Sequence, residues 1–198
     1  KRPMYAGNAF GVVSISSPVQ VVSVRQSAFA AAEPAGSASA VEKIAVHRQG
    51  LRHMAVSVFV LSGGETLIQR RALTKYHTPG LWANSCCTHP HWGETPLDCA
   101  RRRLAQELGV RGFDLSRIGQ VEYRADVGDG MTEHEVVEIF TATAPSRPDV
   151  VPDPAEVMDT RWVTPDGLAA QIEAEPGLFT PWLRIYMRDH AGQIFGPA

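Results

Sequence analysis

The residues best suited to chemistry lie in one short loop and in the segments that follow it. Residues 84–90 read Asn-Ser-Cys-Cys-Thr-His-Pro, which places a thiol at Cys87 and an imidazole at His89. Glu107 adds a carboxylate farther along, and residues 133–135 (Glu-His-Glu) add two more. Imidazoles and carboxylates hold metal ions, and the same groups with a thiol transfer protons. The sequence therefore predicts a metal site beside a proton-transfer site.

Two of these carboxylates are arranged to meet. Glu133 and Glu135 are two residues apart, a spacing that puts both side chains on one face of a β-strand. Neighbouring carboxylates repel each other unless a positive group lies between them, and a divalent cation is one such group. The alternative is a solvated strand edge, because exposed charges are common.

Three histidines, His47, His53 and His89, lie on segments that border predicted loops. Histidine together with glutamate suits zinc, and it suits manganese or magnesium when waters complete the coordination. The chain has seven histidines, so some proximity by chance is expected. The alternative for each ring is a structural or solvated role.

The adjacent cysteines are expected to differ. Cys87 lies in a loop bounded by proline and glycine, with His89 two residues on, where an imidazolium or a metal can alter the proton affinity of the thiol. Cys86 is expected to point away if the backbone is extended. Cys99 is expected to pack on a helix. The alternative for Cys87 is a buried small apolar side chain.

Basic side chains could bind an anion near the loop. Arg70, Arg71 and Lys75 cluster at the end of a predicted strand, and Arg103 lies on a predicted helix. Guanidinium groups match phosphate oxygens in pairs, and lysine supplies a point charge. The alternatives are a solvated basic edge and, for Arg103, an i,i+4 pair with Glu107.

The clearest element that could position these residues is a helix from Thr95 to Leu108. Thr95 is the expected N-cap, Pro96 the first helical residue, and Asp98 the partner in a capping box. Gly109 is expected to end the helix.

The other expected elements follow from apolar periodicity and turn residues. Glycines at 63 and 64 join two strands of a hairpin, and residues 76–90 are expected to be loop. The expected strands are 54–61, 66–70, 119–124, 135–143 and 157–163, and two short helices are expected at 166–173 and 181–190. Strands and helices in this order argue for an α/β or α+β fold.

The 198 residues suit one domain, 41–198, preceded by an extension, 1–40. The extension is poor in acids and resembles a transit peptide, which would imply organellar import. The alternative, which we favour, is a poorly ordered extension or a strand pair at residues 12–13 and 19–24. The net charge of −2 gives no sign of nucleic-acid binding, and no apolar run is long enough for a membrane span. An odd count of three cysteines favours a reducing, cytoplasmic compartment.

In order along the chain, these motifs resemble the type 1 isopentenyl-diphosphate isomerases. The resemblance rests on residues 70–75 (RRALTK), 79–90 (PGLWANSCCTHP), 93–94 (GE), 107–110 (ELGV), 123–125 (YRA), 133–136 (EHEV) and 179–182 (FTPW). It covers about residues 41 to 190. That family belongs to the Nudix superfamily, so the resemblance implies a Nudix-type mixed β-sheet sandwiched between helices.

The Nudix box, G-x5-E-x7-R-E-U-x-E-E-x-G-U with U apolar, departs from its consensus in this chain. Its first glycine falls on Thr88 and its first glutamate on Glu94. Two later glutamates fall on Arg103 and Gln106, while Glu107 is retained. Those carboxylates bind the magnesium of Nudix hydrolases. Their replacement weakens a hydrolase interpretation and matches the isomerase form of the box.

The resemblance also implies roles for individual residues. Cys87 and Glu135 would be the catalytic thiol and carboxylate, with Tyr123 assisting Glu135. A divalent ion (manganese, magnesium or zinc) would be held by His47, His53, His89, Glu133 and Glu135. A magnesium ion accompanying the substrate would be bound by Glu107. Arg71, Lys75 and Arg103 would contact the diphosphate, and Trp182 would line the pocket.

The implied reaction interconverts isopentenyl and dimethylallyl diphosphate, the precursors of isoprenoid biosynthesis. A proton would add to the alkene, giving a tertiary carbocation, and another would leave from the opposite face. The implied partner is a small allylic or homoallylic diphosphate, and the protein would be a monomer or a weak homodimer. Two alternatives are a Nudix hydrolase of nucleoside diphosphate derivatives and a binding module with a structural metal, for which Cys87 has no evident role.

Overall fold

The computed structural model describes residues 2–4, 9–11, 46–91 and 93–196. The chain divides into two units, Lys1–Lys43 and Ile44–Ala198. In the first unit, β1 (Arg2–Met4) pairs antiparallel with β2 (Ala9–Gly11). The strand pair expected at residues 12–13 and 19–24 lies outside the described residues. All the candidate site residues lie in the second unit.

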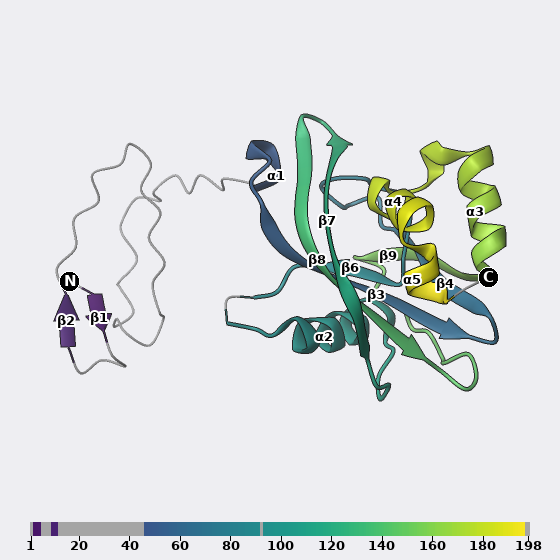
Figure 1. Ribbon diagram of the computed structural model, residues 1–198, viewed down its shortest axis with the longest axis horizontal. Coiled ribbons are helices and arrows are strands. Elements are labelled where there is room, and N and C mark those ends of the chain that lie inside the picture. Colours follow the sequence, from purple (N-terminus) through teal and green to yellow (C-terminus); the bar gives the residue numbers. More distant parts are fainter. Residues whose placement is uncertain (1, 5–8, 12–45, 92, 197–198) are drawn as a thin grey trace. The chain divides into compact units, whose positions relative to one another are not determined.

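The second unit is built on a seven-stranded sheet (Figure 1). Its strands are β3 (His53–Ser62), β4 (Glu65–Arg71), β5 (Trp82–Ala83), β6 (Cys86–Thr88), β7 (Ser116–Gly128), β8 (Met131–Thr143) and β9 (Val157–Val163). The main path is β5-β4-β3-β8-β7, with β6 pairing to β3 and β9 pairing to β4. Only β3 and β8 run parallel among these pairs, so the sheet is mixed.

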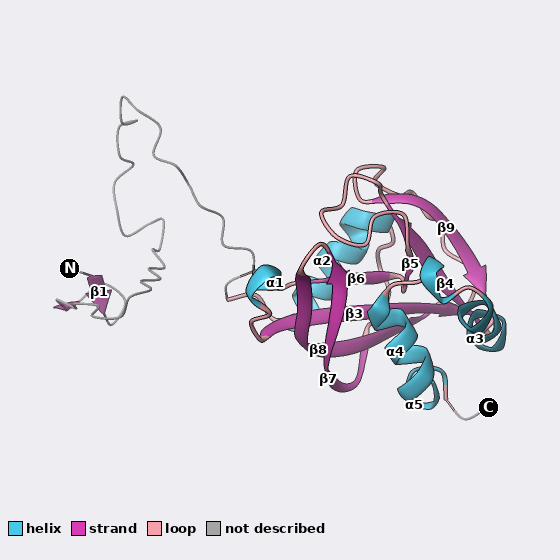
Figure 2. Cartoon of the chain, turned by 90° about the horizontal axis from the view of Figure 1, so that it is seen from above, coloured by secondary structure: helices cyan, strands magenta, loops and turns pink. Residues whose placement is uncertain are grey.

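Helices cover both faces of this sheet (Figure 2). They are α1 (Val46–Gln49), α2 (Pro96–Leu108), α3 (Pro165–Ala174), the short 3-10 helix η3 (Pro176–Leu178), α4 (Pro181–Asp189) and α5 (Ala191–Phe195). One core contains buried residues of α2, and the other contains buried residues of α3, α4 and α5. The expected α/β (α+β) class, with a mixed sheet sandwiched between helices, is confirmed.

Strand alternation divides the central strand β3 between the two cores. Ala55 and Phe59 pack into the core with α4, whereas Val56, Val58 and Val60 pack into the core with α2. All five side chains are fully buried. A strand covered on both faces reads as a continuous apolar run rather than an alternating one, and this accounts for the uninterrupted pattern at residues 54–61.

The expectation that residues 76–90 are loop was wrong in part, because they contain β5 and β6. β5 pairs with β4, and β6 pairs with β3. These two- and three-residue strands exist through pairing with distant segments, which a local pattern does not reveal. β7 and β8 also extend beyond their expected bounds, to 13 residues each. The expected hairpin turn is confirmed, with Gly63 and Gly64 at φ 58° and 79°.

The ends of α2 follow the sequence signals closely. The Thr95 hydroxyl accepts a hydrogen bond from the Asp98 backbone N–H at 3.2 Å. The Asp98 carboxylate accepts from that hydroxyl at 2.7 Å, whereas a full capping box would direct it to the Thr95 backbone N–H. Gly109 ends the helix in the left-handed conformation, with φ 70° and its N–H bonded to Ala105 O. This helix carries Arg103 and Glu107 toward the sheet.

Replacing Gly109 by alanine is expected to lower the free energy of unfolding by about 2 to 4 kcal/mol. The left-handed conformation is unfavourable for alanine, and the new Cβ would lie 3.0 Å from Val151 O, so packing strain adds to the loss. Gly112→Ala is the matched control, because Gly112 has φ 79° with nothing within 4 Å of its Cβ position. Urea unfolding measures both variants. Equal losses would show that the Val151 contact contributes nothing.

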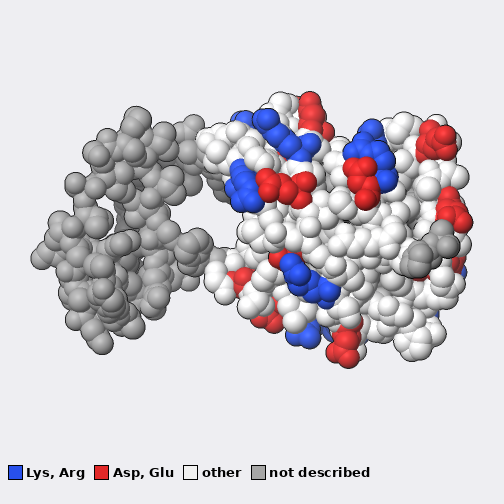
Figure 3. Space-filling model, in the orientation of Figure 1, with Lys and Arg blue, Asp and Glu red and all other residues white. Residues whose placement is uncertain are grey.

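Among the residues that the structure describes, no helix is long and apolar enough to cross a membrane. On the face drawn in Figure 3, lysine and arginine side chains lie next to aspartate and glutamate side chains. Exposed ion pairs of this kind, such as Arg52 with Glu122 at 2.9 Å, contribute little to stability.

Candidate active site

Five side chains that can ligate a metal converge at one place: His47, His53, His89, Glu133 and Glu135. One donor atom from each of them lies within 4.8 Å of all the others. The structure therefore brings together the five residues predicted for the histidine–glutamate metal site, whereas Glu107, the predicted ligand of a second ion, is not among them.

The strand register explains this convergence. His53 opens β3 and is the direct partner of Glu135 in the parallel β3–β8 pair. Glu133 lies two residues earlier on β8 and so faces the same side. His89 directly follows β6, which pairs with β3, and His47 lies on α1, which contacts β8.

The donor set fits a divalent cation. Glu133 Oε2 and His47 Nε2 are both buried and lie 3.3 Å apart, yet neither has a hydrogen-bond partner among the described residues. His53 Nδ1 lies 2.8 Å from Leu51 O, so Nδ1 carries a hydrogen and Nε2 is the nitrogen that faces the cluster. Nitrogen and carboxylate oxygen donors together suit zinc and the transition metals.

The pKa shifts of Glu133 and Glu135 also favour a bound cation at this site. Burial raises the pKa of Glu133, and the charge of Glu135 adds to this, although His47 opposes it. Burial also opposes ionisation of Glu135, but hydrogen bonds with His53 and His89 lower the pKa of Glu135 well below its usual range. Both carboxylates can be ionised together only if positive charge accumulates beside them.

A cavity of about 150 Å³ lies beside this cluster and has Cys87, Glu135 and Trp182 on its wall. The thiol and the carboxylate thus open into one space rather than two. Tyr123 donates a hydrogen bond to Glu135 Oε2 at 2.5 Å, and burial raises the pKa of Tyr123 well above its usual value. Tyr123 is therefore a neutral donor that fixes the Glu135 carboxylate.

The two adjacent cysteines face opposite sides of the sheet, as expected. Cys86 is buried in the core with α2, whereas Cys87 packs against the core with α4. Ser57 Oγ lies 3.4 Å from Cys87 Sγ and 2.9 Å from the Tyr186 hydroxyl. Burial and then the charge of Glu135 raise the pKa of Cys87 well above its usual value. Cys87 is therefore a thiol at neutral pH, able to donate a proton.

Three cationic side chains line the same cavity: Arg71, Lys75 and Arg103. Arg103 Nη2 donates to Glu107 at 2.6 Å and to Glu156 at 3.0 Å, and Lys75 also pairs with Glu156. The buried Nε atoms of Arg71 and Arg103 have no hydrogen-bond partner among the described residues. A buried donor without a partner is costly, so this part of the cavity suits an anion.

Two other predicted residues have well-defined positions. Glu107 is buried behind Arg103, and its second oxygen accepts a hydrogen bond from Gln69 at 2.9 Å. The structure does not place it on the cavity wall. The Trp182 indole N–H donates to Asn84 Oδ1 at 3.2 Å, and the Arg71 guanidinium lies 5.3 Å from its ring centre.

Several residues at the site were missed from the sequence: Ser57, His77, Glu156 and Tyr186. Ser57 lies within an apolar run and Tyr186 within an apolar helix face, so both read as core positions. Glu156 is 53 residues from its partner Arg103. His77 could have been considered, because it follows the cationic residue Lys75 in the same loop.

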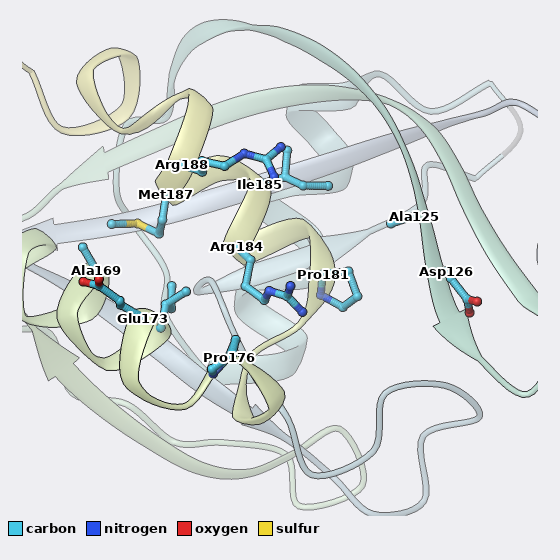
Figure 4. Close-up of a pocket in the computed structure, with 11 residues that line it drawn as sticks. Ala125, Asp126, Ala169, Glu173, Pro176, Pro181, Arg184, Ile185, Met187 and Arg188 are labelled. Atoms are coloured by element: carbon cyan, nitrogen blue, oxygen red, sulfur yellow. The ribbon is translucent and has the colours of Figure 1, made fainter.

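A larger hollow lies elsewhere in the described part of the chain. It measures about 580 Å³ and is lined by residues of β7, α3, η3 and α4. Figure 4 shows Arg184 on α4 and Asp126 on β7 among its lining residues. None of the predicted site residues lines it. The larger of these two cavities is therefore not the candidate active site.

Comparison with known proteins agrees with this architecture. A NUDIX domain matches residues 51–183. Among solved structures, DR0079 from Deinococcus radiodurans is 20% identical, with a TM-score of 0.58, covering 69% of this chain and 81% of that one. A MutT NUDIX hydrolase from Burkholderia pseudomallei is 20% identical, with a TM-score of 0.55, covering 71% and 98%. These two likenesses show the fold.

Relatives with higher sequence identity show which family the chain belongs to. The isopentenyl-diphosphate Delta-isomerase of Rhodobacter capsulatus is 60% identical over 157 residues, which are 79% of this chain and 89% of that protein. The chain belongs to the isopentenyl-diphosphate Delta-isomerase family. A further member, from Dinoroseobacter shibae, is 56% identical over 161 residues, covering 81% and 92%. Membership in this isomerase family confirms the resemblance seen in the sequence.

Proposed function

We propose that this protein interconverts isopentenyl diphosphate and dimethylallyl diphosphate and so supplies isoprenoid biosynthesis. The activity is the one named for its relatives. The observation that supports its assignment to this site is that Cys87 and Glu135 open into one cavity, which Arg71, Lys75 and Arg103 also line. Proton donors and acceptors therefore lie beside a place for a diphosphate.

In this proposal the diphosphate is bound by Arg71, Lys75 and Arg103. Charge-assisted hydrogen bonds from these groups provide binding energy away from the reacting carbons, where it can orient the alkene. Magnesium is expected to accompany the diphosphate, with Glu107 as its proposed ligand. The lost carboxylates at Arg103 and Gln106 fit a substrate whose diphosphate stays intact.

The double bond moves by the addition of one proton and the removal of another. One of the two groups, Cys87 as the thiol or Glu135 through Tyr123, delivers a proton to the terminal alkene carbon, and the alkene π electrons form the new C–H bond. The other group, in its ionised form on the opposite side, accepts the proton that leaves the neighbouring carbon, whose C–H electrons form the new double bond. An unactivated alkene is a poor base, so the donor must be strong and water excluded.

The tertiary carbocation that forms between these two steps must be stabilised by groups that cannot attack it as nucleophiles. The Trp182 ring lines the cavity, and an aromatic face contributes about 2 kcal/mol to binding a desolvated cation. The side chains of His47, His53, His89, Glu133 and Glu135 would hold manganese, magnesium or zinc. That ion would withdraw electron density from Glu135 and so lower its proton affinity.

Other features stay predictions. The substrate is expected to be the small diphosphate alone, with no nucleic-acid or membrane partner, acting on a monomer or weak homodimer. We propose a cytoplasmic location, or an organellar one if residues 1–40 are a transit segment ahead of a catalytic domain at 41–198.

The deciding experiment is conversion of isopentenyl diphosphate in deuterated water. Each forward turnover should place solvent deuterium in the product methyl group and release no phosphate. Mass spectrometry and a phosphate assay report the two outcomes separately. Phosphate release from a nucleoside diphosphate derivative, without isomerisation, would instead support the hydrolase alternative.

Lys75→Met is expected to raise KM about 10-fold or more and to change kcat less. A hydrogen bond to a charged group contributes about 1.5 to 3 kcal/mol, and 1.4 kcal/mol corresponds to a factor of ten. Steady-state kinetics with isopentenyl diphosphate measure both constants. Lys75→Arg is the control, because it keeps the charge and should keep KM near that of the wild type. An unchanged KM in Lys75→Met would remove Lys75 from the diphosphate site.

A further inference from the structure

The two oxygens of the Glu133 carboxylate have different surroundings. Oε1 lies 3.2 Å from Nε2 of His77. Oε2 lies 3.3 Å from His47 Nε2 and 3.8 Å from His53 Nε2, and it has no hydrogen-bond partner among the described residues. One oxygen is therefore tied to a buried histidine while the other faces the cluster.

His77 stands outside the group of five donors but against it. It is not among the side chains whose donor atoms converge within 4.8 Å, although its ring centre lies 5.2 Å from that of His47. The side chain is 5% exposed. It packs edge-on against Tyr76 and Trp182, with ring centres 4.4 and 5.9 Å away, so the ring has little freedom to turn.

The 3.2 Å contact with Glu133 and the hydrogen bond with Thr78 together assign the position of the His77 proton. An ionised carboxylate only accepts hydrogen bonds, so the His77 nitrogen facing Glu133, Nε2, must carry the hydrogen. The other nitrogen, Nδ1, lies 3.1 Å from the Thr78 hydroxyl oxygen and accepts its hydrogen. A directed chain thus runs from Thr78 through His77 to Glu133.

Backbone contacts hold Thr78 and His77 in place, although the backbone conformation of Thr78 is strained. Thr78 has φ 46°, which is unfavourable for a β-branched residue and persists only where surrounding contacts enforce it. Arg71 supplies two of these contacts. Its Nη2 donates to His77 O at 3.1 Å, and its carbonyl accepts from Gly80 N at 3.0 Å.

We propose that His77 is a positioning residue for the metal centre, holding Glu133 so that Oε2 faces His47 and His53, with Thr78 fixing its tautomer. The inference rests on the metal site of the proposed function. Groups that hydrogen-bond to a metal ligand orient it, and their loss weakens metal binding about 10- to 100-fold.

The test is metal affinity, measured on the full chain by competition with a chromophoric chelator for Mn²⁺ and for Zn²⁺. His77→Ala should bind one ion with a dissociation constant raised about 10- to 100-fold. His77→Gln should recover part of the affinity, because its amide N–H can still donate to Glu133. Thr78→Val should weaken binding less than His77→Ala does, and Thr78→Ser should bind like the wild type. His190→Ala, a histidine on no cavity or cluster described above, should have no effect.

Three outcomes would overturn the inference. Wild-type affinity in His77→Ala, with circular dichroism and the metal-free melting temperature unchanged, would show that His77 does not position the centre. Loss of the bound ion in both His77→Ala and His77→Gln would make His77 a ligand rather than a positioning residue. Absence of binding in the wild type itself would defeat the proposed metal site, and the inference with it.

Discussion

Cys87→Ala and Glu135→Gln should each abolish conversion of isopentenyl to dimethylallyl diphosphate while leaving the fold intact. A positioned acid or base contributes about 10² to 10⁴ in rate, and here both a donor and an acceptor are required in one turnover. Cys87 and Glu135 line the same cavity, and Cys87 is the one thiol among the described residues on its wall. Product formation from labelled substrate measures the loss over this range.

Matched controls exist for both variants. Cys99→Ala removes another free cysteine, which is buried in the core with α2. Glu138→Gln changes a glutamate on the same strand as Glu135 that bonds to Arg117 and Gln120. Both controls should retain most of the activity. Turnover near the wild-type rate in Cys87→Ala or Glu135→Gln, with activity kept in the controls, would sink the assignment.

Removal of divalent metal is expected to abolish the activity and to lower the melting temperature by about 5 to 10 °C. An ion present at about 100 times its dissociation constant stabilises the folded state by roughly 2.7 kcal/mol, and about 2 to 4 °C corresponds to each kcal/mol in a domain of this size. Without the ion, the buried pair Glu133 and Glu135 repel each other. Dialysis against a chelator, followed by calorimetry and an assay, measures both effects.

The same experiment separates an enzyme from a binding module with a structural metal. The two hydrophobic cores on either side of the sheet do not depend on the histidine cluster, so the metal-free protein should remain folded. Manganese added back should restore turnover, and chelator already saturated with calcium should have no effect. Unfolding on chelation, with no activity recovered by any ion, would favour the structural alternative.

The sequence predicted elements whose signals are local and missed those that depend on distant pairing. The start and end of α2 were readable because Thr95, Pro96 and Gly109 act on their own backbone. β5 and β6 were not, because their partners β4 and β3 precede them by 12 or more residues. Local propensity carries no information about such a partner.

The residues of the candidate site also fall into two groups: those that local sequence signals predicted and those that depend on distant contacts. Glu133 and Glu135 could be assigned to one face from their spacing, and the motif around Cys87 carried the resemblance. Ser57 and Tyr186 could not be found, because a hydroxyl in an apolar run becomes significant only when folding places it 3.4 Å from a particular sulfur or 2.9 Å from another hydroxyl. No residue spacing encodes a contact between strand β3 and helix α4.

The parallel pairing of β3 with β8 has a consequence for how the protein acquires its activity. His53 and Glu135 are direct partners in that pairing, although about eighty residues separate them, and closing so long a loop is entropically costly and slow. During refolding, helix and hairpin signals should return before any histidine–carboxylate cluster exists to capture an ion. Ion uptake should therefore report one of the last steps of folding. An ion bound by residues of both β3 and β8 should in turn stabilise the pairing of these two strands.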